Sequence, residues 1–134
     1  MAGPPPSRSE SLLHLAKARQ NYRLYQQLKR GGDDLDWAVT VLFYAALHLA
    51  EAYLVEISPS AFSRPKGREE RSAAIRRHLP QIYADYQFLR TRSTWARYHV
   101  RKPKPTPQAV QQYETQQFAR IVDELRRLGV SRAP

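Results

Sequence analysis

The apolar residues of this chain are concentrated in one stretch, residues 36–57. Between residues 37 and 55, only Thr40, His48 and Glu51 are clearly polar. A helix that is apolar on nearly every side is either the buried centre of a helical bundle or a membrane span. Because polar residues interrupt this stretch and amphipathic segments flank it, we predict the central helix of a bundle and no membrane contact.

The polar residues of this stretch are spaced at i, i+4, i+8 and i+11. They are Thr40, Tyr44, His48 and Glu51. This spacing places them on one face of a helix, so we predict a polar stripe that forms either a polar network or a site. We expect His48 to face residues 96–98, although a lone histidine on an apolar helix is more often a hydrogen-bonded buried side chain than a catalyst.

The segment before the central helix predicts another helix at about residues 8–30. Ser7 and Glu10 have the spacing of a capping box at its start. Gly31 follows the basic end of the helix and is expected at the C′ position.

Two more helices are predicted after the central one. The third helix begins near Glu69, breaks at Pro80 and continues through residues 81–99. Prolines at alternate positions make residues 101–107 an extended connector, and the last helix covers about residues 107–128. The predicted fold class is all-α: an up-and-down four-helix bundle with a broken third helix and a Pro-rich connector before the last helix.

Length and cysteine content limit the class of protein. A chain of 134 residues suits one domain with a single core. We place this domain at residues 8–129, between a flexible leader (1–7) and a tail (130–134). With no cysteine, disulfides and thiolate metal sites are excluded. Because the N-terminus has no apolar secretory segment, we expect a cytoplasmic protein.

The formal net charge of +10 is unevenly distributed. Residues 64–104 carry twelve basic and three acidic side chains, interleaved with aromatic residues. This composition is typical of a surface that contacts phosphate groups. The alternative is a solvated arginine-rich face with the aromatic residues in the core. The basic residues that we expect to contact RNA are Arg64, Lys66, Arg68, Arg71, Arg76, Arg77, Arg101, Lys102 and Lys104.

Three sequence pieces carry a family resemblance. They are FYAALHLAEAYL at residues 43–54, REERSAAI at 68–75 and YADYQFLRTRSTWARY at 83–98. Together they resemble the HEPN superfamily, small helical bundles found in prokaryotic toxin and defence proteins and in RNA-processing effectors. The resemblance implies a HEPN-like four-helix bundle that is often dimeric and is sometimes a metal-independent ribonuclease.

Catalytic members of that superfamily carry an arginine, four to six residues, and then a histidine. The resemblance implies that the histidine is the acid/base and the arginine stabilises phosphate. Arg92 and His99 fit this pattern, and so do Arg71 and His78. Seven-residue spacing on a helix returns to within about 20° of the same face. We prefer the first pair, which gives a catalytic set of Arg92, Arg97, Tyr98 and His99.

Two hypotheses about function follow. In the first, the chain binds single-stranded RNA and acts as a metal-independent endoribonuclease of a toxin or defence system. In the second, it is a non-catalytic accessory or dimerising module that docks on an acidic partner, such as an antitoxin or a nucleotidyltransferase. Similar families carry a histidine near the start of the third helix, where this chain has Arg68-Glu69-Glu70, and this departure favours the second hypothesis. Arg97 then has a structural alternative, a salt bridge to Glu51 or Asp36.

A metal site is not expected. The four histidines are scattered along the sequence at His14, His48, His78 and His99. No metal-ligand motif and no cluster of carboxylates accompanies them. We therefore expect neither a metal ion nor another cofactor.

Overall fold

The computed structural model describes residues 6–58, 67–100 and 103–130, and every regular element in these ranges is helical. The prediction of an all-α fold is confirmed for these residues. The elements are α1 (Pro6–Gly31), α2 (Leu35–Ile57), α4 (Arg68–His78), the 3-10 helix η1 (Pro80–Ile82), α5 (Tyr83–Tyr98), α6 (Pro107–Gln112), the π-helix η2 (Tyr113–Phe118) and α7 (Ala119–Arg127).

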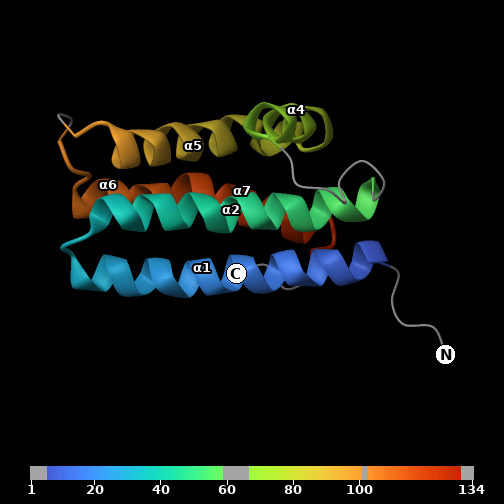
Figure 1. Ribbon diagram of the computed structural model, residues 1–134, viewed down its shortest axis with the longest axis horizontal. Helices are drawn as coiled ribbons and strands as arrows, with labels where there is room; N and C mark the ends of the chain where they lie inside the picture. Colours follow the sequence, from blue (N-terminus) through green and yellow to red (C-terminus); the bar gives the residue numbers. More distant parts are fainter. Residues whose placement is uncertain (1–5, 59–66, 101–102, 131–134) are drawn as a thin grey trace.

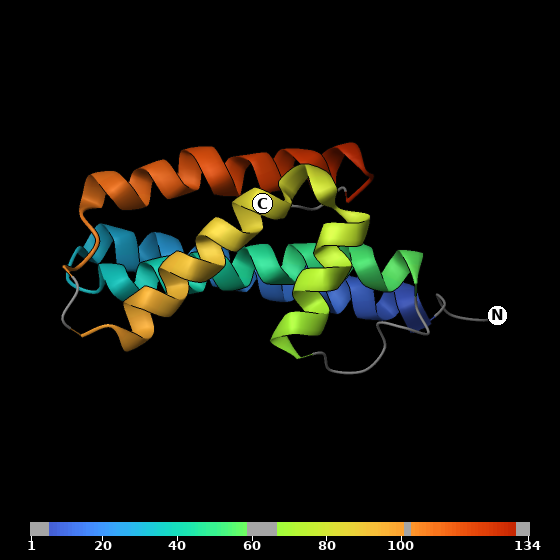
Figure 2. The ribbon, with the colours of Figure 1, turned by 90° about the horizontal axis from the view of Figure 1, so that it is seen from above.

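The long helices run in alternating directions along the molecule (Figure 1). The helices α1 and α5 run one way, whereas α2 and the continuous α6–η2–α7 segment run the other. Seen from above, α4 and α5 form a V that is closed at η1, and α5 crosses the other helices diagonally (Figure 2). The candidate site described below is lined by residues from the end of α5 and from the open side of this V.

The central position of α2 follows from its composition. By length and composition alone this helix could cross a membrane, but 83% of its most apolar window is buried inside the fold. Leu42, Leu49 and Leu54 are fully buried there, and burying each leucine contributes about 1.5–3 kcal/mol to folding. Large apolar side chains are exposed only near the two ends of α2 among the described residues: Trp37 in the first turn is 55% exposed and Ile57 in the last turn 42%.

The helix ends agree with the predictions in part. Thr106 caps α6 as expected, because its hydroxyl oxygen accepts a hydrogen bond from the Ala109 N–H at 3.1 Å. The first helix is longer than predicted. It begins at Pro6, so Ser7 is not its N-cap residue, and it includes Gly31, so the left-handed position after the helix (φ 79°) falls to Gly32.

The break in the third helix is confirmed. The helix α4 ends at His78, and Pro80 then opens the short η1 turn, where its missing N–H costs no hydrogen bond. Leu79 and Ile82 on either side of Pro80 are both buried. These two side chains fasten the corner of the V to the core.

The last helix contains a π-turn that the sequence did not predict. Residues 113–118 form η2, in which the wider turn accommodates one extra residue. The turn keeps Val110, Phe118 and Ile121 all in the core. Val130, which was predicted to open the tail, is buried; residues 131–134 lie outside the described residues.

Candidate functional site

The end of α5 forms the wall of a pocket of about 320 Å³. The first turns of α2, the connector before α6 and Tyr113 at the start of η2 complete its lining. Arg92, Arg97 and His99, three of the four predicted catalytic residues, line this one pocket. Tyr98 does not line it, and its side chain is 67% exposed. Lys104, predicted to contact RNA, lies in the wall formed by the connector.

Arg92 is positioned by aromatic rings. Its guanidinium carbon lies 5.0 Å from the ring centre of Phe88 and 5.2 Å from that of Trp95, four residues before and three residues after it on α5. Within the described residues, its N–H groups have no hydrogen-bond or ion-pair partner. The arginine is therefore oriented without using the donors that would bind a phosphate group.

His99 is the residue that ends α5. Its backbone N–H donates to the carbonyl of Trp95 at 3.0 Å, and its exposed ring lies 5.9 Å from the Trp95 ring. The ring has no hydrogen-bond partner among the described residues. An imidazole in this position can take up or give a proton at the mouth of the pocket.

Arg97 is tied to α2 rather than to a carboxylate. One terminal nitrogen donates to the Tyr44 hydroxyl at 2.6 Å, and the guanidinium lies over the rings of Tyr44 and Tyr98 at 5.6 and 5.3 Å. Its Nε is buried and has no hydrogen-bond partner in the part of the chain that the structure describes. The structural alternative, a salt bridge to Glu51 or Asp36, is not formed. Arg97 thus keeps its charge beside the pocket.

The predicted polar stripe of α2 does not act as one unit. Tyr44 contacts Arg97 on α5, but His48 contacts His14 on α1. The two imidazole Nδ1 atoms lie 3.0 Å apart and the rings stack with centres 5.2 Å apart. The prediction that His48 faces residues 96–98 is wrong, because its ring packs against His14 of α1, which covers this side of α2.

The environment of His48 favours its neutral form. Burial, and after it the charge of neighbouring His14, lowers its pKa to about 4, although Glu51 opposes this shift. Neutral imidazoles can pair through one Nδ1–H donor and one Nδ1 acceptor. His48 therefore joins two helices and lies outside the pocket lining.

Glu51 holds the arginine of the second candidate pair. Arg71 Nε donates to Glu51 at 3.0 Å; the carboxylate side chain is 4% exposed and the arginine side chain 21%. An arginine held in this way is less accessible to a phosphate than Arg92. The geometry therefore favours Arg92 and His99 over Arg71 and His78.

The remaining predicted RNA contacts fall in two groups. Arg68 lines a depression of about 300 Å³ between α4 and α5, and Arg76 and Arg77 line another of about 450 Å³ nearer the corner of the V. These three side chains are exposed. The other group, Arg64, Lys66, Arg101 and Lys102, lies outside the described residues.

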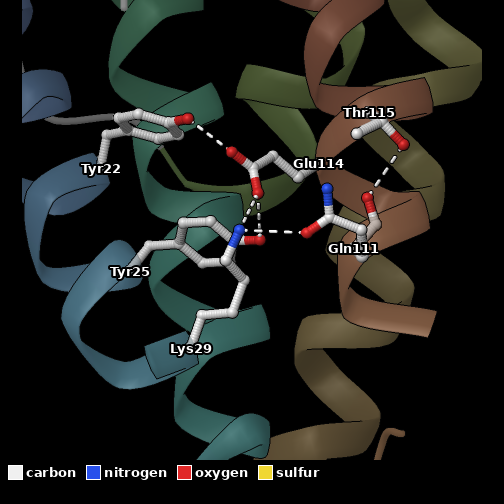
Figure 3. A network of polar contacts seen from close by, with 6 residues as sticks. All are labelled: Tyr22, Tyr25, Lys29, Gln111, Glu114 and Thr115. Carbon is white, nitrogen blue, oxygen red and sulfur yellow. Dashed lines mark hydrogen bonds and ion pairs between the residues drawn. The ribbon is translucent and has the colours of Figure 1, made fainter. Parts of the chain in front are cut away.

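A second polar cluster joins α1 to the π-helix (Figure 3). The carboxylate of Glu114 accepts hydrogen bonds from Tyr22 at 2.5 Å, from Tyr25 at 2.7 Å and from Lys29 at 2.7 Å. Lys29 also donates to Gln111 at 3.1 Å. The sequence did not predict this cluster, because its carboxylate, Glu114, lies on the π-helix η2.

The pKa shifts in this cluster show that its hydrogen bonds favour an ionised Glu114 and neutral tyrosines. Burial opposes the ionisation of Glu114, but the hydrogen bonds from Lys29, Tyr22 and Tyr25 outweigh it and lower its pKa. Burial and the hydrogen bond to Glu114 raise the pKa of Tyr22 to about 12, and that of Tyr25 is also raised. At neutral pH the cluster therefore holds one carboxylate, two neutral phenols and one ammonium group.

Comparison with protein-family models, with curated proteins and with solved structures found no match. The HEPN resemblance therefore stays a prediction. In the described part of the chain, no three histidine, aspartate or glutamate side chains gather where they could hold a metal ion.

Proposed function

We propose that this chain binds single-stranded RNA at the pocket beside the end of α5 and cleaves it without a metal ion. One observation supports this function above the others: Arg92, Arg97 and His99 line the same pocket. The two cations supply positive charge for a phosphate, and the histidine supplies an imidazole that can act as acid or base.

The reaction that suits these groups is an internal transesterification of RNA, in which the ribose 2′ oxygen displaces the 5′ oxygen from the adjacent phosphate. Neutral His99 takes the proton of a ribose 2′-hydroxyl, and the 2′ oxygen forms a bond to the adjacent phosphorus while the bond to the 5′ oxygen breaks. The 5′ oxygen takes a proton from water. Arg92 stabilises the charge that develops on the phosphate oxygens. The products are a 2′,3′-cyclic phosphate and a 5′-hydroxyl.

A HEPN-like four-helix bundle is the finer fold that fits this function. Its support is the alternating direction of the long helices, the broken third helix and the position of the YADYQFLRTRSTWARY piece along the pocket wall. On this proposal the chain is a cytoplasmic toxin or defence ribonuclease, and a two-fold dimer is its expected assembly.

The second candidate function is docking on an acidic protein such as an antitoxin or a nucleotidyltransferase. Its support is the exposure of large side chains around the pocket: 40% for Trp95, 67% for Tyr98 and 94% for Val100. Tryptophan, tyrosine and arginine are the residues that most often dominate binding between proteins. Such a module would bind its partner without cleaving RNA.

Single-turnover cleavage of labelled RNA in EDTA tests the first proposal. We expect His99→Ala to slow cleavage by about 10²–10⁴-fold, while the matched variant His78→Ala cleaves like the parent. Loss of cleavage only in His78→Ala would move the site to the second pair. A folded parent protein that cleaves no RNA would contradict the ribonuclease proposal and leave the docking function.

Binding is measured separately from cleavage. The affinity for a single-stranded oligonucleotide with 2′-O-methyl groups, which cannot form the cyclic phosphate, is determined at increasing salt. Contacts with several phosphates release counterions, so affinity is expected to fall steeply between low and moderate salt. Negligible affinity at low salt would contradict RNA binding itself.

A further inference from the structure

Trp95 occupies the border between two hollows of the surface. It lines the pocket beside the end of α5 and also the depression between α4 and α5. His99 is the other residue that lines both. The indole is 40% exposed, with the guanidinium of Arg92 at 5.2 Å and the ring of His99 at 5.9 Å. An exposed aromatic ring beside a cation and an imidazole can hold a flat, electron-rich ligand.

The hollows also connect along the V of α4 and α5. The depression that contains Trp95 shares Gln87 with the next depression, toward the corner of the V. We call this pair of depressions the V groove. Exposed cations stand along it at Arg68, Arg76 and Arg77. Figure 2 shows how α4 and α5, the two helices that supply most of the lining of this groove, diverge from their corner at η1.

The sequence of pocket, exposed indole and spaced arginines along the surface suits the binding of a single nucleic-acid strand. Spaced cations track a phosphate backbone, and an aromatic ring stacks on an unpaired base whatever its identity. A base inside a duplex already has neighbours on both faces, so a partly exposed indole selects an unstacked base. An acidic peptide would use the cations of the groove but gains little from an indole placed for stacking.

We propose that Trp95 is a stacking platform for the unpaired base next to the phosphate held by Arg92, and that the V groove carries the adjoining strand. This inference rests on the proposed function and deepens it: it names the residue that selects an unpaired base next to the cleaved bond and the surface that carries the adjoining strand. Trp95 binds the ligand, and the reacting atoms remain those beside His99.

The chain offers a matched control for Trp95. The other tryptophan, Trp37, is 55% exposed and lines none of the hollows described above. A Trp37→Phe background leaves Trp95 as the single indole, so tryptophan fluorescence then reports on Trp95 alone. The ligand is a single-stranded 2′-O-methyl oligonucleotide, tested beside its duplex and beside the same strand with abasic sites.

We expect the oligonucleotide to quench Trp95 fluorescence and the abasic strand not to. Base stacking on an aromatic side chain is worth about five- to hundredfold in affinity, so Trp95→Ala should weaken binding by that factor. Trp95→Phe should recover most of the loss, and Trp37→Ala should bind like the parent. The duplex should bind no more tightly than the abasic strand.

Two results would overturn the inference, and they are distinguishable from failure of the proposed function. If the parent binds RNA but Trp95→Ala binds equally well, or if abasic and intact strands bind alike, Trp95 is not a platform although RNA binding stands. If the parent binds no strand at low salt, the proposed function and this inference both fail.

The V groove is tested with exposed arginines. Combined Arg76→Ala and Arg77→Ala substitutions should weaken binding of a strand of about ten nucleotides and reduce its salt dependence. They should leave a three-nucleotide strand unaffected, because it fills only the pocket and the platform. Arg23→Ala, an exposed arginine on α1, is the control. Equal loss for short and long strands would contradict a track along the groove.

Discussion

The cluster around Glu114 and the pocket beside His99 use similar side chains in opposite ways. In the cluster, a carboxylate with a lowered pKa accepts hydrogen bonds from two phenols and an ammonium group, so the charges are satisfied within the protein. In the pocket, Arg92 and His99 contact aromatic rings, and no hydrogen-bond partner of their N–H groups and ring nitrogens is found within residues 6–58, 67–100 and 103–130. The difference separates a structural network from a site prepared for a ligand.

This comparison extends to the whole of α2. Its polar side chains are directed to three different helices: Tyr44 to α5, His48 to α1 and Glu51 to α4. The contacts to α1 and α4 are between side chains within the fold, and only the contact to α5 reaches the pocket. Variants of the internal pairs should therefore change stability, whereas variants of the pocket should change ligand binding and leave stability almost unaltered.

The largest effect on stability is expected for the ion pair between Arg71 and Glu51. Arg71→Met keeps the alkyl stem but leaves a buried carboxylate without this partner, which should cost about 3 kcal/mol of unfolding free energy. Urea denaturation measures the loss. The control is Arg8→Met, which removes an exposed ion pair to Glu56 and should cost less than about 1 kcal/mol.

The same variant sharpens the choice between the two arginine–histidine pairs. If Arg71→Met is less stable but cleaves RNA normally under folding conditions, Arg71 is a structural residue. If it keeps full stability and loses cleavage, Arg71 and His78 become the catalytic pair and the distinction drawn above is wrong.

The next largest effect is expected for the Glu114 cluster. Glu114→Gln presents amide hydrogens to donors that now meet a carboxylate, so at least one hydroxyl or ammonium group loses its acceptor. We expect a loss of about 2 kcal/mol in unfolding free energy with unchanged RNA affinity. The control is Glu69→Gln, whose side chain is 87% exposed where it pairs with Arg90. A Glu114 variant that folds normally but binds RNA poorly would make this cluster part of the site.

The order of these elements explains which of them the sequence could predict. The central helix could be predicted because its composition is apolar all round, and the break at Pro80 and the Thr106 cap follow from local backbone chemistry. The π-turn could not, because its apolar spacing differs from that of an α-helix by a single residue over one turn. For the same reason the sequence did not predict the Glu114 cluster, because Glu114 lies in that turn.

The site was predictable to a similar extent. Arg92 lies on α5 and His99 follows seven residues later as its C-cap residue, and both line one pocket, as their spacing predicted. The partners of Tyr44, His48 and Glu51 were not predictable. A polar stripe shows which face of a helix carries polar side chains, but it does not show which neighbouring helix packs against each of them. Trp95 was overlooked, although its position three residues after Arg92 and four before His99 was the available signal.

A smaller effect is expected from acid titration of His48. Its pKa is lowered to about 4 in the folded protein, against about 6.5 when unfolded. The stabilising contribution of neutral His48 is therefore complete above pH 6.5 and is lost as the pH falls toward 4. We expect this loss to be about 1–2 kcal/mol, because the side chain stays partly in water.

The measurement is the unfolding free energy at pH 7 and pH 4.5, for the parent and for His48→Asn. Glu114, whose pKa is also lowered, contributes acid sensitivity of the same sign, so the comparison between the two proteins isolates His48. The variant should lose less stability over this interval than the parent. An equal loss in both would show that the pairing of His14 and His48 does not restrain protonation.

The smallest effect on stability is expected in the pocket itself. Arg92→Ala removes stacking contacts at a half-exposed position, and His99→Ala removes a ring after the last turn of α5. Each should change the unfolding free energy by no more than about 0.5 kcal/mol, while Arg92→Ala weakens RNA binding and both slow cleavage. If either variant destabilises the protein as much as Glu114→Gln, its side chain supports the fold, and the contrast between an internally satisfied cluster and an open pocket no longer identifies the site.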